Sequence, residues 1–345
     1  MNDARNMKIN IRTRIGAVVI GRNEGQRLTT CLQSIIGLIE HVVYVDSGST
    51  DNSVHTAKAL GVKTIALDMS IPFTAARARN EGARFLLGLN QDIDAIQFID
   101  GDCEMQPQWL ATALHFLDTD DNYAVACGRR RERYPEQSIY NQLCDIEWDT
   151  PVGDALACGG DALIRVEAYK QVNGYRDDLI AGEEPEMCFR LRENEWKIHR
   201  LDEEMTLHDA AMTKLSQWWK RTVRTGYAFS LGNSIHGHSA ERYWAKECRS
   251  IYRWGTLLPI IFLLTMFLNP WFILLLVLYP IQIIRIALRR PTLNLFKQHV
   301  TMLLRVLGKN QSLMPAHGRR VMLGRYKKSG CGYRPVSVRH LTWRS

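Results

Sequence analysis

Two carboxylates separated by one glycine, in the triplet Asp100-Gly101-Asp102, have the clearest capacity for chemistry in this chain. The residues before them, 95–99, predict a buried strand, so both side chains are expected at a strand end. Carboxylate oxygens are good ligands for Mg²⁺ or Mn²⁺, and such an ion offsets the negative charge that grows on a departing diphosphate. Because Asp and Gly are also common turn residues, the triplet indicates a metal site only in combination with other residues.

A second group of carboxylates occurs in the segment Gly182-Glu183-Glu184-Pro185-Glu186. A carboxylate can act as the general base that removes the proton from an attacking hydroxyl group. The same segment is typical of a helix start, because glutamates stabilise the positive end of the helix dipole and Pro185 suits the first helical turn. Both interpretations are compatible, since an N-terminal turn also holds its side chains rigidly. Glu183 and Glu184 are therefore candidate bases.

The segments that must position these carboxylates alternate between strand and helix patterns. Strands are expected at residues 15–20, 41–45, 62–67 and 95–99, and helices at 28–36, from Asp51 or Asn52 to Gly61, and at 74–89. This alternation predicts an α/β fold with a mostly parallel, doubly wound sheet. Ligands of such sheets bind beyond the carboxyl ends of the strands, where Asn23, Asp46 and Asp100 fall.

Four linked motifs in this region resemble the family 2 inverting glycosyltransferases. They are Val19-Ile20-Gly21-Arg22-Asn23-Glu24-Gly25, Val45-Asp46-Ser47-Gly48-Ser49-Thr50-Asp51, Ala78-Arg79-Asn80-Glu81-Gly82 and Asp100-Gly101-Asp102. The resemblance continues through Gly159-Gly160-Asp161-Ala162 to the acidic segment 182–186, and it covers about residues 15–230 in the family's order. Several motifs in order are more specific than any one of them.

The resemblance implies a Rossmann-like GT-A fold, whose first half binds the nucleotide and whose second half receives the acceptor. By position, Asp46 contacts the nucleobase, while Asn23, Glu24, Arg79 and Asp100 shape the donor site. An Asp can accept the imide N–H of uracil, which favours a UDP-sugar, and an Arg can approach phosphate. The alternatives are a capped turn at residues 47–51 and a solvated helix residue at Arg79.

The acidic segment departs from the family in one respect. Glu184 matches the family's catalytic Asp, but its side chain is one methylene longer, so Glu183 remains an alternative base. Some related enzymes place a metal-ligating His where this chain has His208, which makes Asp100, Asp102 and His208 the expected ligands of Mg²⁺ or Mn²⁺. A lone histidine is also often structural. The pair His236 and His238 has no Cys, Glu or third His nearby, and we interpret it as a loop.

The segment Gln217-Trp218-Trp219-Lys220-Arg221 differs from the Gln-x-x-Arg-Trp signature of processive polysaccharide synthases, which favours single transfers. Its tryptophans suit an acceptor platform or a membrane interface, and Arg221 and Arg224 could approach a diphosphate. Ordinary helix packing with a basic solvent face is the alternative.

The C-terminal third predicts contact with a membrane. Residues 256–284 are 29 residues without a formal charge, divided by Asn269-Pro270 into halves of about 18 to 21 Å, against roughly 30 Å of hydrocarbon. Basic residues flank the run on both sides, which favours a hairpin dipping into the inner leaflet over a single crossing. A buried hairpin of a soluble protein is the alternative.

The end of the chain is strongly basic. From residue 244 onward there are 17 Lys or Arg against one acid, Glu247, and residues 309–345 carry nine basic residues and no acid. Residues 293–307 have the spacing of an interfacial amphipathic helix. Anionic lipids are the expected partner, and nucleic acid is the less favoured one because an apolar run adjoins the tail.

Four segments are expected: an extension at residues 1–14, a GT-A catalytic domain at 15–243, membrane-associating helices at 244–308 and the basic tail at 309–345. No signal peptide core is visible near the start, and the eight cysteines lack a C-x-x-C pair, so thiols in a reducing compartment are expected. These features predict the cytoplasmic face of the inner membrane.

The resulting hypothesis is an inverting glycosyltransferase of the hexosyltransferase type. It would move a sugar from a nucleotide-diphosphate sugar to a hydroxyl of a glycolipid or polysaccharide, with metal assistance. The alternatives are a polyprenyl-phosphate sugar synthase and a catalytically silent, membrane-anchored sugar-nucleotide-binding protein. A sugar-1-phosphate nucleotidyltransferase is disfavoured, because its glycine-rich and basic signature is missing from residues 16–27.

Overall fold

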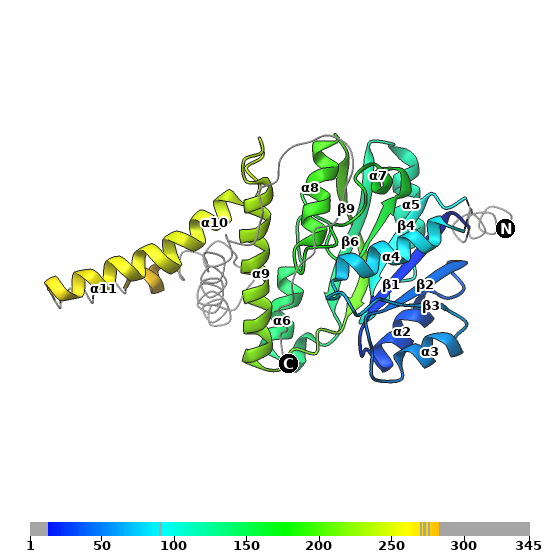
Figure 1. Cartoon of the computed structure of the whole chain (residues 1–345), viewed down its shortest axis with the longest axis horizontal. Coiled ribbons are helices and arrows are strands. Elements are labelled where there is room, and N and C mark those ends of the chain that lie inside the picture. Colours follow the sequence, from blue (N-terminus) through cyan, green and yellow to red (C-terminus); the bar gives the residue numbers. More distant parts are fainter. Residues whose placement is uncertain (1–12, 90–91, 270, 272–273, 275–276, 283–345) are drawn as a thin grey trace.

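The computed structural model describes residues 13–89, 92–269, 271, 274 and 277–282, and it shows one sheet flanked by helices (Figure 1). The first half contains four strands, β1 (Ile15–Gly21), β2 (His41–Asp46), β3 (Lys63–Ala66) and β4 (Ala95–Asp100). They pair in parallel in the order β3-β2-β1-β4. The helices between them are α2 (Gln26–Ile35), α3 (Ser53–Ala59) and α4 (Ala75–Leu87). The α/β fold and these seven elements confirm the sequence prediction.

Both faces of this sheet are buried, which explains why its strands are almost continuously apolar. Along β1, Val18 and Ile20 join the core that contains α4 residues, whereas Ala17 and Val19 join the core on the other face. Gly82 allows α4 to approach β1 closely, because a Cβ at this position would lie 2.4 Å from Cγ1 of Val18. The glycine of the motif at residues 78–82 is therefore a packing requirement.

The second half of the sheet is mixed, so the expectation of a mostly parallel sheet is correct only for the first half. Its strands are β5 (Cys103–Met105), β6 (Tyr123–Glu132), β7 (Gly153–Asp154), β8 (Ala162–Arg165) and β9 (Lys197–His208). β8 pairs antiparallel with β4 and with β6, and β5 and β7 pair antiparallel with β9, whereas β6 and β9 are parallel. β5 follows β4 after two residues but does not pair with it, because it lies at the far edge of the sheet beside β9.

The helices of the second half are α5 (Trp109–Thr119), α6 (Ile139–Glu147), α7 (Val166–Gln171), α8 (Glu183–Glu193) and α9 (Leu215–His236). α8 begins at the acidic segment, with three glutamates in its first turn, as the helix-start interpretation predicted. His236 ends α9, so its interpretation as a loop residue was wrong. The His236 ring accepts or donates a 2.8 Å hydrogen bond at Glu186 of α8, which joins the two helices.

Beyond α9, the chain projects away from the sheet as α10 (Ala245–Tyr252), a π-helical turn, η2 (Arg253–Leu257), and α11 (Leu258–Leu268) (Figure 1). The apolar run is divided after Leu268, as predicted, but its first half continues without a break from a helix that begins at Ala245. The 24 residues Ala245–Leu268 are long and apolar enough to span a membrane by length and composition. After Asn269 the chain returns, because the Tyr279 hydroxyl donates a 2.9 Å hydrogen bond to the Trp254 carbonyl. Most of the predicted extension (residues 1–12), the later part of the predicted membrane-associating segment (residues 283–308) and the predicted basic tail (309–345) lie outside the described residues.

Candidate active site

The strand register brings the predicted donor-side residues to one edge of the sheet. Asp46 pairs with Gly21 at the ends of β2 and β1, and Asp100 pairs with Ile20 at the ends of β4 and β1. The loop after β1, which contains Asn23 and Glu24, starts at the same edge. The expected convergence of these residues at the carboxyl ends of the parallel strands is therefore observed.

Asp100 lies between two arginines. Arg79 donates from Nη2 to its Oδ1 at 2.7 Å, and Arg130 approaches its Oδ2 at 3.4 Å. Burial raises the pKa of Asp100, and the attraction of Arg79 and Arg130 only partly opposes it. Arg79 is almost fully buried and also donates from Nη1 to Glu183 Oε1 at 2.8 Å. Arg79 is thus the link between the triplet at residues 100–102 and the acidic start of α8, and it is not a solvated helix residue.

Arg130 and Asp161 are site residues to which the sequence interpretation assigned no role. Asp161 is fully buried, pairs with Arg130 at 2.7 Å, and accepts hydrogen bonds from the Asp100 amide and the Thr206 hydroxyl. A Cβ at Gly160 would lie 2.8 Å from Asp100 Oδ2 and 3.1 Å from Arg130 Nη2, so this glycine leaves space for the cluster. The Gly159-Gly160-Asp161 motif was the available signal for Asp161, whereas Arg130 lies in none of the motifs quoted in the sequence analysis.

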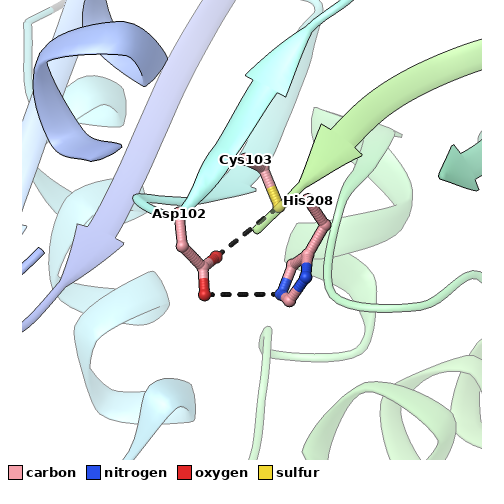
Figure 2. A group of neighbouring side chains, drawn as sticks. All are labelled: Asp102, Cys103 and His208. Atoms are coloured by element: carbon pink, nitrogen blue, oxygen red, sulfur yellow. Dashed lines mark hydrogen bonds and ion pairs between the residues drawn. The ribbon is translucent and has the colours of Figure 1, made fainter. Parts of the chain in front are cut away.

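The Asp102 side chain faces the ring of His208 and the sulfur of Cys103, as Figure 2 shows. His208 Nε2 lies 3.3 Å from Asp102 Oδ2. Burial lowers the pKa of His208, but the attraction and hydrogen bond of Asp102, together with the nearby carboxylate of Glu132, outweigh this effect and raise the pKa to about 9. Burial would raise the pKa of Asp102, but His208 lowers it below its usual range. The carboxylate and the imidazole are therefore held as an ion pair.

This pair fits a divalent cation. Ligand atoms of Asp102, Cys103 and His208 lie within 4.8 Å of one another, and Cys103 faces His208 in the β5/β9 register. Burial raises the pKa of the Cys103 thiol well above its usual value, so Cys103 stays a thiol and is a poor ligand. Oxygen and imidazole nitrogen remain, which suit Mn²⁺.

Glu24 adds negative charge beside this pair. A Cβ at Gly101 would lie 3.3 Å from Glu24 Cγ, so Glu24 packs over the glycine of the triplet. Burial and then repulsion from Asp102 raise the pKa of Glu24, although it pairs with Arg27 at 2.6 Å. A cation near Asp102 would relieve this repulsion.

The side chains of Asp46 and Asn23 make hydrogen bonds within the loops around them. Asp46 accepts from the Tyr44 hydroxyl at 2.9 Å and from the amides of Gly48 and Ser49. Asn23 has a positive φ of 58° and its side-chain oxygen accepts from the Thr50 amide at 2.7 Å. Asp46 therefore holds the loop after β2, and Asn23 joins the loop after β1 to it. Direct contact of either residue with a nucleotide stays a prediction.

The two candidate bases point to different surroundings. Glu183 contacts Arg79 and through it Asp100. Glu184 is buried, accepts from the Cys158 amide at 2.6 Å and lies 3.3 Å from the Cys188 sulfur. Glu183 is therefore connected to Asp100 and its neighbours, whereas Glu184 is directed toward two core cysteines. The assignment of either residue as base stays a prediction.

The segment 217–221 is structural in part. Trp218 is buried and packs with Cys144 and Met212, so it cannot serve as an acceptor platform. Arg221 pairs with Glu147 of α6 at 2.6 Å. The helix-packing interpretation is correct for these two residues.

Comparisons with known proteins agree with this architecture. The family model described as "Glycosyl transferase family 2" matches residues 17–172. Uncharacterized glycosyltransferases of Rickettsia typhi and Rickettsia felis are each 38% identical over 52 residues, which is 15% of this chain and 18% of their own length. The chain thus matches less than a fifth of these relatives. The structure of a mannosyltransferase from Pyrobaculum calidifontis, in complex with GDP-Man and Mn²⁺, has a TM-score of 0.60 at 14% identity and covers 88% of each chain. At this identity the likeness establishes the fold.

Proposed function

We propose that this chain is a family 2 glycosyltransferase that transfers a sugar from a nucleotide-diphosphate sugar to an acceptor hydroxyl with inversion and with a divalent cation. The observation that carries the proposal is the cluster of Asp100, Asp102 and His208 at the carboxyl edge of the sheet, linked through Arg79 to Glu183. It joins a candidate cation site to a candidate base within one set of contacts.

Asp102 and His208 would hold Mg²⁺ or Mn²⁺, with Asp100 as a further carboxylate of the same triplet. The complex of the Pyrobaculum mannosyltransferase with Mn²⁺ supports this choice of ion. When bound, the ion supplies positive charge that stabilises the departing nucleoside diphosphate.

Arg79 and Arg130 would bind the diphosphate of the donor. Each is a planar guanidinium that already approaches Asp100, so a phosphate group entering here meets two cations. Asp46, at the end of β2, would orient the nucleobase through its loop, and a UDP-sugar is the donor that we propose to test first.

Inversion requires a base that takes the acceptor proton as the new bond to the anomeric carbon forms and the bond to the diphosphate breaks. We assign this role to Glu183, because it contacts Arg79, whereas Glu184 is held by Cys158 and Cys188. Glu184, which matches the family's catalytic Asp, is the alternative.

A membrane position is the last part of the proposal. The helix Ala245–Leu268 exposes large apolar side chains such as Leu264, Phe267 and Leu268, of which Phe267 is 89% exposed. The return of Tyr279 to Trp254 supports a hairpin over a straight crossing. A hairpin at the cytoplasmic face would place the site beside a glycolipid or a growing polysaccharide.

The test is nucleotide release by the purified full chain, with a panel of nucleotide sugars and lipid extracts, with and without Mn²⁺. The expected result is Mn²⁺-dependent release with at least one donor, and its loss in Asp102→Asn. The matched control is Asp121→Asn, whose carboxylate is 96% exposed and pairs only with Arg165 among the described residues. Tight donor binding with release at background for every pair would instead support a silent binding protein.

A further inference from the structure

Glu132, the last residue of β6, is a buried carboxylate that the proposed reaction has not used. Its side chain is fully buried. Its Oε1 accepts from the Tyr134 amide and the Asn141 side chain, both at 3.2 Å, and its Oε2 accepts from the Ala210 amide at 3.1 Å. All three donors are neutral. A carboxylate is rarely buried without a cationic partner, so this placement requires an explanation.

The cationic partner that the sheet provides is His208. Glu132 and His208 are paired residues in the parallel register of β6 and β9, so their side chains emerge side by side. Glu132 Oε2 lies 3.7 Å from Nδ1 of His208, and among the described residues His208 is the one ion-pair partner of Glu132. The imidazole thus lies between two carboxylates, with Nε2 facing Asp102 and Nδ1 facing Glu132.

Nδ1 of His208 is buried and has no hydrogen-bond partner within the described part of the chain. The Trp148 ring packs edge-on against the imidazole at 4.7 Å and limits its rotation. A small shift of the imidazole would bring Nδ1 into hydrogen-bond range of Glu132 Oε2. Histidines that bind metals almost always donate their other ring N–H to a carboxylate, carbonyl or water, and this fixes the tautomer.

We propose that Glu132 is a positioning residue for the cation site: it accepts the Nδ1–H of His208 and thereby directs the Nε2 lone pair toward the ion beside Asp102. The inference rests on the proposed function, in which Asp102 and His208 hold the ion. It adds a residue that neither the triplet nor the family resemblance indicated.

Glu132 also has a structural role, and the test must distinguish this role from the positioning of His208. Asn141 donates to Glu132 Oε1 and accepts from the Met212 amide at 3.0 Å, so the two residues together hold the segment after β9. Asn141→Ala disturbs this segment and leaves the Glu132 carboxylate beside His208. It is the matched control for local destabilisation.

The experiment is a Mn²⁺ titration of the full chain followed by electron paramagnetic resonance, with pulsed measurement of the ¹⁴N modulation from a coordinated histidine. We expect wild type to show the modulation, His208→Ala to lose it, and Glu132→Gln to bind Mn²⁺ about 10- to 100-fold more weakly. Asn141→Ala should keep its affinity within about threefold of wild type, even where its melting temperature falls as far as that of Glu132→Gln.

Two results would contradict the inference about Glu132 while leaving the proposed cation site intact. One is unchanged Mn²⁺ affinity and modulation in Glu132→Gln, and the other is equal weakening in Asn141→Ala, which would make the role structural. If Glu132→Gln does not fold, Glu132→Asp withdraws the carboxylate by one methylene, and affinity equal to wild type would overturn the inference. If wild type binds no Mn²⁺, or binds it without His208, the proposed cation site fails first and the inference fails with it.

Discussion

Two compact groups of potential metal-ligand side chains occur in the described part of this molecule, and their surroundings differ. Asp102, Cys103 and His208 form one, and Cys158, Glu184 and Cys188 form the other, with ligand atoms in each lying within 4.8 Å of one another. In the first, Asp102 and His208 are partly exposed, whereas all three residues of the second are buried. Proximity of potential ligands is therefore not sufficient for a cation site.

The two groups also differ in charge. Asp102 and His208 are an ion pair beside Glu24 and Asp100, so negative charge accumulates there. In the second group, a hydrogen bond with Cys188 and burial raise the pKa of Cys158 well above its usual value, and both cysteines belong to the apolar core around α4. We interpret the first group as the cation site and the second as packing that anchors Glu184.

The largest effect is expected where the first group loses its carboxylate. Asp102→Asn removes a charged ligand of the proposed ion, and nucleotide release should fall by about 10³-fold or more. Release measured at saturating Mn²⁺ checks this, with Asp121→Asn as the control. A loss below tenfold would mean that the first group is not the cation site.

The second-largest effect on the rate of transfer is expected to distinguish Glu183 from Glu184. Glu183→Gln should lower the rate of transfer by about 10²- to 10⁴-fold at unchanged donor affinity, because the base contributes on this scale. Glu184→Gln should lower it by less than about tenfold. The reverse order in single-turnover assays would return the base role to Glu184. Retained turnover in both variants would indicate an acceptor that is already anionic, such as a polyprenyl phosphate.

A smaller effect is expected from pH on the metal-free protein. The pKa of His208 is raised from 6.5 to about 9, so its proton stabilises the fold. This stabilisation is complete below pH 6.5 and is lost as the pH rises through 9. It is worth at most about 3.5 kcal/mol, because a tenfold change in a proton-binding constant corresponds to about 1.4 kcal/mol. Urea unfolding in chelator at pH 6 and pH 9.5 measures it against His208→Gln. An equal pH dependence in both proteins would show that His208 is not paired.

The smallest effect belongs to the second group. Cys188→Ala should reduce the free energy of unfolding by roughly 1 to 2 kcal/mol, as for loss of one buried atom, and should leave Mn²⁺ affinity unchanged. Denaturant unfolding and Mn²⁺ titration of this variant check both parts. A tenfold loss of Mn²⁺ affinity would mean that the buried group also holds the ion.

The local sequence pattern was sufficient to predict the first half of the fold. Strands β1 to β4 are apolar runs that mostly end at Gly or Asp, and the helices between them include one with its own cap, Thr74, which accepts from the Arg77 amide. The mixed second half depends on pairings between distant segments, such as β4 with β8, and no local pattern encodes these. The same limit applied to the site: Asp100 and Asp102 are close in sequence, whereas Arg130, Asp161 and Glu132 become site residues through strand register.

The most direct test of the account is the location of bound Mn²⁺ in the full chain. We predict one site, whose affinity falls by at least tenfold in Asp102→Asn and in His208→Ala and is unchanged in Cys188→Ala. Affinity that depends on Cys188 and not on Asp102 or His208 would contradict the account.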